Sequence, residues 1–284
     1  MAAIRNPIEW GAEQLRHATQ HVESSGRSVR GAATAAPMVR RIRVSDLRDA
    51  LGRGFEDFAA CRTDVLFLCI VYPVVGLLLV HLTFDYDMIR LLFPLASGFA
   101  LVGPIAAVGL YEMSRLREQG ASAGWADAFG MIRSPSFGAI VVLGLLLLAI
   151  FLIWLAAAEL IFALTLGANP PNSLYGFVRD VFTTPAGWTM TAVGVGIGFL
   201  FAVVVLAISV VSFPLLLDRD VGVRTAIATS FRAVKANPGT MAVWGMIVAG
   251  GLVIGSIPVF LGLIVVVPVL GHATWHLYRK VVAV

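Results

Sequence analysis

Two histidines and two carboxylates near the ends of apolar segments could do chemistry. His272 and His276 are four residues apart, so on a helix they share one face. When the apolar segments are aligned on their prolines, Asp218 takes the place of His272 and Glu112 takes the place of His276. Two imidazoles and two carboxylates at one depth could bind a divalent metal ion or form a proton-accepting cluster.

An interfacial belt is the alternative interpretation of this layer. Tyr111, Trp275 and Tyr278 are neighbours of the ionisable residues in the sequence. Aromatic residues commonly anchor helices at the membrane surface, where polar groups meet water. The cluster further requires that the aligned helices lie side by side, so both interpretations stay open at the level of sequence.

Glu159 is the one ionisable residue well inside an apolar run. A charge at that depth is costly and by default marks function. The run is longer than a bilayer requires, however, so Glu159 could instead lie at the outer interface. There it could pair with Arg90 or Arg179.

The sequence lacks the common catalytic and cofactor-binding motifs. It contains no nucleophile elbow, paired-cysteine metal site, Walker loop or haem-attachment motif, so no residue is predicted to be catalytic and no cofactor is indicated. The glycine-rich run at 194–198 lies inside an apolar segment without a preceding strand, which argues against a phosphate loop. Gly194 with Gly198, and Gly251 with Gly255, are better interpreted as contacts between membrane helices, within one chain or between two copies.

The composition indicates that these residues are positioned by membrane-embedded elements. The chain has 284 residues, of which 58% are hydrophobic and 13% charged, whereas a soluble domain is roughly a quarter charged. No basic patch is interleaved with aromatic residues, which argues against a nucleic-acid partner. Residues 1–45 lack the apolar core of a signal peptide and are expected to form a flexible cytoplasmic tail.

Long apolar runs predict the membrane-spanning helices, since a bilayer core of about 30 Å needs about 20 apolar residues. The runs are Val65–Phe84, Leu91–Met113, Phe137–Leu166, Gly187–Leu217 and Met241–Tyr278. The last would be about 57 Å long as one helix, so we divide it at Gly255–Pro258; a single, strongly tilted helix is the alternative. The prediction is an all-α polytopic membrane protein with six transmembrane helices in residues 46–284.

Charge orients the six predicted helices. With the N-terminus inside, 19 of the 21 basic residues are cytoplasmic, and the other two are Arg90 and Arg179. This distribution satisfies the positive-inside rule only for an even number of helices. We therefore expect a bacterial inner-membrane protein with both termini in the cytoplasm.

Similar polar stretches precede each predicted hairpin. Asp46–Asp64 and Val223–Thr240 carry apolar residues at identical offsets, and Trp125–Pro135 is a shorter version. Their three- and four-residue spacing predicts amphipathic helices lying at the cytoplasmic interface. The sequence thus predicts three repeats of an interfacial helix followed by a membrane hairpin.

Three sequence runs carry a family resemblance: YPVVGLLL, LVGPIAAVGLYEMSRLREQG and VPVLGHATWHLYRK. The chain resembles an uncharacterised family of bacterial predicted integral membrane proteins, known as a domain of unknown function, from about Asp46 to Lys280. Some members carry a cytochrome c oxidase label. The chain does not resemble the catalytic subunit of that oxidase, so the label implies at most an association with respiratory complexes.

The function expected from these features is non-enzymatic. The chain would bind or organise other membrane components, among them the lipid bilayer and other membrane proteins such as a respiratory complex. The alternative is a small-solute transporter or channel, which the hairpin repeat, Glu159 and the prolines favour. A lipid-modifying enzyme ranks third, with Glu112, Asp218, His272 and His276 as its candidate groups.

Overall fold

The structure is a computed structural model. It describes residues 37–69, 107–121, 134–167 and 173–283, together with isolated positions between 74 and 127. Every regular element in these ranges is a helix, and the one β-bridge joins Val39 to Val282. The predicted all-α class is confirmed for this part of the chain. Most of the first two apolar runs, of Trp125–Pro135 and of the N-terminal tail lies outside the described residues.

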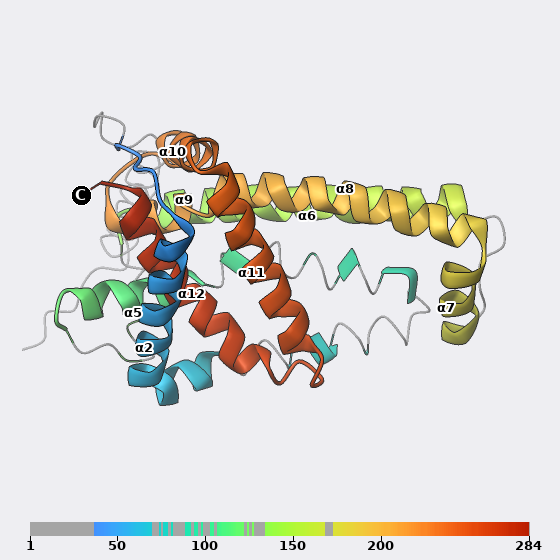
Figure 1. The fold of residues 1–284 in the computed structure, drawn as a ribbon, viewed down its shortest axis with the longest axis horizontal. Coiled ribbons are helices and arrows are strands. Elements are labelled where there is room, and N and C mark those ends of the chain that lie inside the picture. The colour runs from blue at the N-terminus through green and yellow to red at the C-terminus, as the bar shows by residue number, and fades with distance from the viewer. Residues whose placement is uncertain are drawn as a thin grey trace, which may run out of the picture.

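Two long helices, α6 and α8, form an antiparallel pair. Helix α6 covers Phe137–Thr165, and α8 covers Pro185–Ser209 and is continued by α9, Ser212–Asp218. The two long helices run side by side in Figure 1. The third and fourth predicted apolar runs are therefore confirmed almost to the residue.

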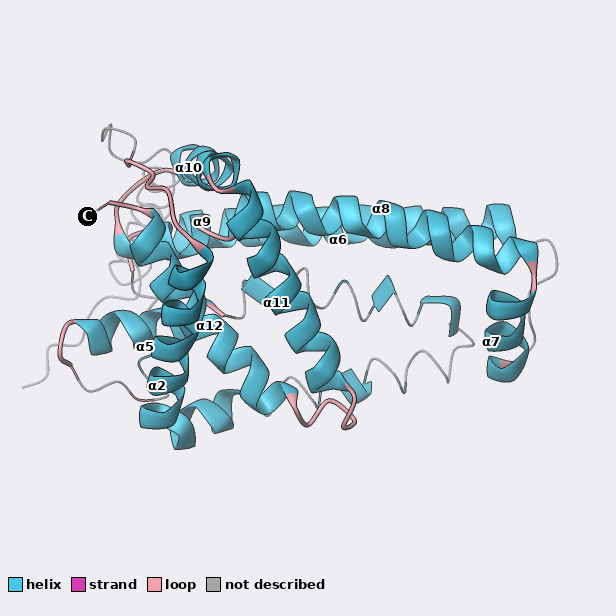
Figure 2. Cartoon of the chain, viewed as in Figure 1, coloured by secondary structure: helices cyan, strands magenta, loops and turns pink. Residues whose placement is uncertain are grey.

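A short helix that the apolar runs did not predict closes the far end of this pair. Helix α7, Leu174–Thr183, lies across that end in Figure 2. The Ser173 side chain accepts from Gly176 N–H and caps its start. Thr184 ends α7 by donating to the Asp180 carbonyl and begins α8 by accepting from Gly187 N–H. Capping side chains thus fix both boundaries of the turn between α7 and α8.

The last apolar run is a hairpin rather than one helix. Helix α10, Val223–Ala236, leads into α11, Pro238–Ser256, and α12 follows as Leu263–Val281. Between α11 and α12 the chain turns over residues 257–262, where Val259 and Phe260 have positive φ angles of 52° and 64°. The predicted division near Gly255–Pro258 is confirmed, and the single tilted helix is wrong.

The predicted glycine contacts are partly confirmed. A Cβ on Gly251 would lie 3.2 Å from Val266 Cγ1, and one on Gly255 would lie 2.8 Å from Leu263 Cδ2, so both glycines let α11 approach α12. Gly198 faces the Trp154 ring in the same way. A Cβ on Gly194 would meet no atom within 4 Å, so this glycine makes no close packing contact with the described residues.

Helix α2, Val44–Cys69, is the N-terminal element. It continues through the boundary at which we expected an interfacial helix to end and a membrane helix to begin, with a kink at Cys61. Asp46 accepts from Arg43 N–H at 2.8 Å at the start of the helix. Helix α2 packs along α12, and α5, Val108–Glu118, lies beside the same part of α12 (Figure 1).

Both ends of the described chain lie at one end of the molecule. Arg40 N–H donates to the Val281 carbonyl at 2.7 Å, and Ala283 N–H donates to the Met38 carbonyl at 3.0 Å. The Asn237 side chain accepts from Ile42 N–H at 2.8 Å and donates to the Arg40 carbonyl at 3.0 Å. Residues 38–43 are therefore tied to the C-terminus and to the end of α10.

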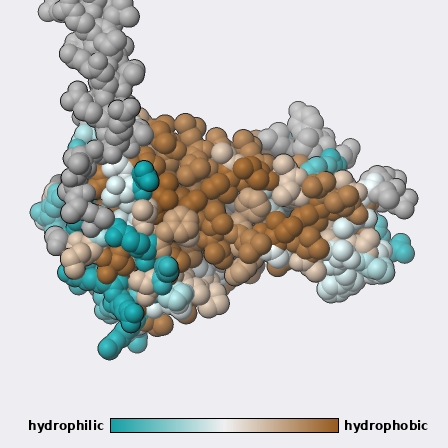
Figure 3. Space-filling model, turned by 90° about the horizontal axis from the view of Figure 1, so that it is seen from above, coloured by the Kyte–Doolittle hydropathy of each residue, from teal (hydrophilic) through white to brown (hydrophobic). Residues whose placement is uncertain are grey.

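The outer surface has the apolar character that lipid requires. Three stretches of the described chain are long and apolar enough to cross a membrane, namely Phe137–Thr165, Pro185–Asp218 and Pro238–Ser256. Large side chains such as Leu145, Leu152 and Leu160 are more than half exposed along α6. Figure 3 shows this apolar surface as a brown band between a hydrophilic end and a paler end. These helices identify the chain as an integral membrane protein.

Candidate functional site: a buried polar cluster between α2, α5 and α12

Small residues bring α2 and α5 against the two sides of α12. A Cβ on Gly54 of α2 would lie 2.7 Å from the Ala273 Cβ, and a Cβ on Gly271 would lie 2.6 Å from Leu110 Cδ1 of α5. Backbones that approach this closely allow short polar side chains on neighbouring turns to meet. The polar residues that meet there form the candidate site.

Five side chains make up this Asp57 cluster: Asp57, Ser114, Arg117, His272 and His276. Asp57 Oδ2 accepts from Ser114 Oγ at 2.6 Å and lies 2.9 Å from His276 Nε2. Asp57 Oδ1 accepts from Arg117 Nε at 2.9 Å. His272 Nδ1 lies 2.8 Å from Ser114 Oγ. One carboxylate of α2 therefore joins two turns of α5 to two turns of α12.

The Asp57 cluster is closed to solvent except at Arg117, whose side chain is 33% exposed. Asp57 is 6% exposed, and Ser114 and His272 are fully buried. Burial on its own would raise the pKa of Asp57, but the hydrogen bonds with His276 and Ser114 outweigh it and hold the pKa below its ordinary value. Burial would lower the pKa of Arg117, whereas its hydrogen bond to Asp57 raises it, with a net increase. The cluster thus favours an ionised Asp57 beside a charged Arg117.

Hydrogen-bond donors and acceptors fix the protonation pattern of the Asp57 cluster. An ionised carboxylate only accepts, so Ser114 gives its single proton to Asp57 and must accept from His272 Nδ1–H. The same logic makes His276 a donor through Nε2–H. His272 Nε2 is then the buried acceptor that has no hydrogen-bond partner in the described part of the chain.

Ser114 donates its proton to a different kind of partner than a nucleophilic serine does. A catalytic serine gives its proton to an imidazole, which is in turn oriented by a carboxylate. Ser114 instead donates directly to Asp57 and is fully buried. The Asp57 cluster can hold three helices together and can hold a proton, but it presents no nucleophile to a substrate.

A second network joins α12 to α5 and α9 at the same end of the molecule. Trp275 Nε1 donates to Glu118 Oε2 at 3.0 Å, and Arg279 Nε donates to Glu118 Oε1 at 3.0 Å. Asp218 Oδ2 accepts from Tyr278 OH at 2.6 Å and from Arg279 Nη1 at 3.4 Å. Arg279 therefore bridges one carboxylate on α5 and another at the end of α9.

The four predicted metal ligands are distributed over different partners. His272 and His276 enter the Asp57 cluster, Asp218 accepts from Tyr278 and Arg279, and Glu112 pairs with Arg115, whose Nη2 lies 2.6 Å from Glu112 Oε1. Among the described residues, no group of three or more His, Cys, Asp or Glu side chains has the geometry to hold a metal ion. Metal binding by these four residues stays a prediction, which metal analysis of the purified protein tests.

The aromatic residues of the proposed belt lie in the core instead. Tyr111 is 3% exposed, Tyr278 is 1% exposed and Trp275 is fully buried. Their burial argues against a belt of rings that face lipid at these three positions.

Glu159 has one of the partners expected for it. Arg90 Nε lies 3.0 Å from both carboxylate oxygens of Glu159, and the Arg90 guanidinium lies 5.4 Å from the centre of the Phe162 ring. Both side chains are more than a third exposed. Such an exposed pair contributes little stability, so its main effect is to join the segment around Arg90 to the end of α6.

Sequence reasoning missed Asp57, Ser114 and Arg117. Asp57 could have been found, since positions 47, 50, 54, 57 and 61 form one helical stripe in which Asp57 is the only charged residue. A lone carboxylate in an otherwise small and apolar stripe predicts a buried polar partner. Ser114 and Arg117 carry no comparable local signal.

The apolar surface, the hairpins and the internal polar networks together define an α-helical integral membrane protein. Residues 92–218 match the family model described as a predicted integral membrane protein (DUF2189). The match extends from the region before α5 to the end of α9 and confirms the resemblance to this family over these residues, which include the run LVGPIAAVGLYEMSRLREQG. No curated protein and no solved structure matches the chain.

Proposed function

We propose that the protein is a non-enzymatic inner-membrane protein that binds or organises other membrane components. The closure of the Asp57 cluster carries this proposal. Ser114 and His272 are fully buried, and their hydrogen bonds go to other side chains of the cluster. Groups that are engaged with one another and shielded from solvent stabilise an architecture rather than act on a substrate.

The surface most open to a partner is on α11. Only 17% of its most apolar stretch is buried within the chain, and Met246, Val253, Ile254 and Ile257 are each more than 60% exposed. A helix that contributes so little to the core can exchange lipid for another membrane helix at low cost. A respiratory complex is the narrower form of this proposal, and it rests on the label that some members of the resembling family carry.

Site-specific photo-crosslinking in native membranes tests this proposal. A photoreactive residue at Val253 on α11 should give a discrete crosslinked band. The same probe at Leu152 on α6, which is similarly exposed, serves as the matched control and should give lipid adducts only. The absence of a discrete band at Val253, or bands of equal intensity at both positions, would contradict a partner surface on α11.

A small-solute transporter or channel is the second candidate, and one observation favours it. His272, Ser114, Asp57 and His276 form a continuous hydrogen-bonded line of groups that can exchange protons. Purified protein in vesicles with an internal pH dye would report solute-dependent proton movement. If this proton movement is lost in His276→Gln but kept in His81→Gln, a control at an exposed site, the transporter would replace the non-enzymatic binding protein as the proposed function.

The expected topology has both termini in the cytoplasm. The bridge between Val39 and Val282 supports it, since it holds the two ends of the membrane domain together. Reporter fusions at Asp85 and Asn172 should read external, and fusions at Gly120, Val221 and Val284 should read cytoplasmic. An external signal at Val284 would require an odd number of spans.

A further inference from the structure

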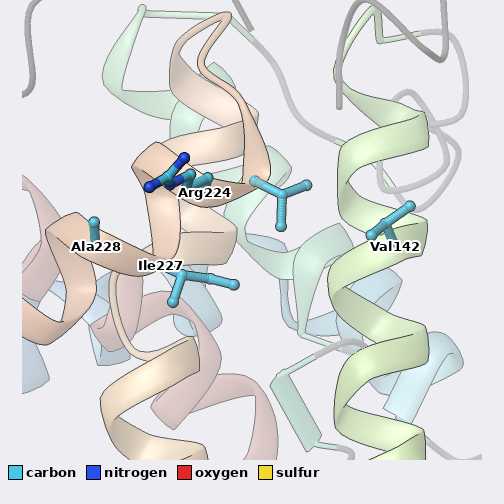
Figure 4. A pocket seen from close by; sticks show the side chains of 5 residues that line it. Val142, Arg224, Ile227 and Ala228 are labelled. Atoms are coloured by element: carbon cyan, nitrogen blue, oxygen red, sulfur yellow. The ribbon is translucent and has the colours of Figure 1, made fainter. Parts of the chain in front are cut away.

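A crevice between α6 and α10 combines an apolar wall with a single cation. It has a volume of about 520 Å³ and is lined by Val142 of α6 and by Val223, Arg224, Ile227 and Ala228 of α10. Figure 4 shows Val142 on one side of the crevice and the α10 residues on the other, with Ile227 pointing across. The volume falls within the range of about 300–1,000 Å³ that is common for ligand clefts.

Arg224 is available to an external anion. Its side chain is exposed, and it makes no hydrogen bond or ion pair in the described part of the chain. Three other cations of this region are engaged, since Arg219 donates to the Ala283 carbonyl, Arg232 donates to Thr229 and Lys280 reaches Asp46. Lys235, in the last turn of α10, has no such partner among the described residues and does not line the crevice. Arg224 is therefore a cation beside an apolar crevice with no counter-ion among the described residues.

The backbone at this place adds to the attraction for an anion. Val223 and Arg224 are the first two residues of α10, and its N-cap, Gly222, supplies no side-chain acceptor to the free N–H groups of that turn. The helix dipole places partial positive charge at the same point. A phosphate held by the Arg224 guanidinium could accept from these N–H groups as well.

An apolar path continues from the crevice along the membrane-facing surface of α6. Val142 is 40% exposed, and Leu145 and Leu146, one turn further along, are 59% and 37% exposed. These side chains could line an acyl chain that extends from a headgroup at Arg224 toward the middle of α6. A free phosphate would use only the cationic end, whereas a phospholipid would use both ends.

We infer that this crevice binds an anionic phospholipid, with the phosphate at Arg224 and the start of α10 and one acyl chain along Val142, Ile227 and α6. The inference rests on the proposed function, because it names one membrane component that the protein binds and the place where it binds. The match of a lone cation to an anionic headgroup, and of apolar walls to an acyl chain, selects this ligand class.

Native mass spectrometry of the purified full-length protein, incubated with phosphatidylglycerol or phosphatidylcholine in detergent, tests the inference. The wild type should retain phosphatidylglycerol preferentially. Arg224→Gln should weaken that binding about tenfold, as expected when one charge-assisted interaction is lost, whereas Arg224→Lys should keep a large part of it. Ala228→Phe should weaken binding of the lipid by filling the crevice while Arg224 is kept.

Arg48→Gln provides the matched control, since Arg48 is the exposed arginine at the corresponding place on α2. It should leave phosphatidylglycerol retention unchanged. Equal loss in Arg48→Gln and Arg224→Gln would mean general attraction to basic residues and would overturn the site, as would full retention in Ala228→Phe. Loss of lipid in Arg224→Gln with the Val253 crosslink intact would separate this site from the partner surface on α11.

Discussion

Helices α2 and α10 share a stripe of buried positions but are held by different chemistry. With Leu47 aligned to Val223, each buried residue of α2 up to Cys61 matches a buried residue in α10 or at its C-cap, and α10 additionally buries Thr229. The matching pairs are Leu47 with Val223, Ala50 with Ala226, Gly54 with Ser230, Asp57 with Ala233 and Cys61 with Asn237. The agreement concerns these two helices alone, and the threefold repeat of interfacial helix and hairpin stays a prediction.

The two helices differ in the polar residues on that shared stripe. Helix α2 is held to α5 and α12 by charged groups, above all Asp57, and Lys280 adds contacts of 3.1 Å to Asp46 and Asp49. On α10 the place of Asp57 is taken by Ala233, and neutral Ser230 and Asn237 accept from backbone N–H groups. The same stripe of buried positions therefore carries charged contacts on α2 and neutral contacts on α10.

The largest difference between the two helices should appear in Asp57→Ala. This change leaves Arg117 and His276 without their carboxylate. Breaking a fully buried ion pair typically costs about 3–5 kcal/mol, and we expect less here because the Arg117 side chain is 33% exposed. We expect a strong fall in thermal stability in detergent, measured by loss of folded protein on heating. Asp49→Ala removes a more exposed acid from the same helix and should cost about 1 kcal/mol or less. Equal losses of stability in Asp57→Ala and Asp49→Ala would contradict the larger contribution that we assign to Asp57.

The corresponding change on α10 should cost less. Asn237→Ala leaves Ile42 N–H and the Arg40 carbonyl without their partner, at about 1–3 kcal/mol. The same heating experiment measures this cost, and Lys235→Ala, at an exposed neighbour, should change little. A cost as large as that of Asp57→Ala would show that the neutral brace is equivalent to the charged one.

The sequence predicted the elements whose boundaries follow from hydropathy. Helices α6 and α8 were expected from apolar runs alone, and the α11–α12 hairpin from the length of the last run and the glycine and proline within it. Helix α7 was missed because it is too short to span a membrane, although Ser173 and Thr184 are recognisable caps. Hydropathy was therefore sufficient to predict the long helices. It was insufficient for α7, a short helix whose position depends on where the α6–α8 pair ends.

The candidate site was predicted only in part, for a physical reason. His272 and His276 were found because residues four apart share a helix face. Their partner Asp57 was missed because partners depend on which helix packs against α12, and that depends on the close approach of Gly54 to Ala273. Sequence periodicity gives the face of a helix but not the helix that it meets.

The exposed aromatic residues offer a test of where the two helices are alike. Phe55 is 57% exposed and Phe231, its counterpart on α10, is 47% exposed. Full burial of such a side chain is worth about 1.5–3 kcal/mol, so each half-exposed ring should contribute about 1 kcal/mol when lipid covers its outer side. Phe55→Asp and Phe231→Asp should therefore reduce stability in membranes by similar amounts, measured by heating in lipid nanodiscs. Unchanged stability in both would show that neither ring contacts lipid.

The smallest expected difference is in the response to acid. Because the folded state holds the pKa of Asp57 below its ordinary value, ionised Asp57 stabilises the fold above the unfolded value of about 3.9, and this contribution is lost as the pH falls through the lower, folded value. The wild type should therefore lose stability below about pH 4 more steeply than Asp57→Asn, which cannot ionise. Changes at the end of α10 such as Asn237→Ala should shift the whole stability profile without changing this slope, because the contacts of Asn237 are neutral.

Thermal unfolding of the wild type, Asp57→Asn and Asn237→Ala between about pH 3 and pH 7 measures the slopes. Identical slopes for wild type and Asp57→Asn would mean that the charge of Asp57 does not couple α2 to α12, and the contrast between the two helices would then be one of shape alone.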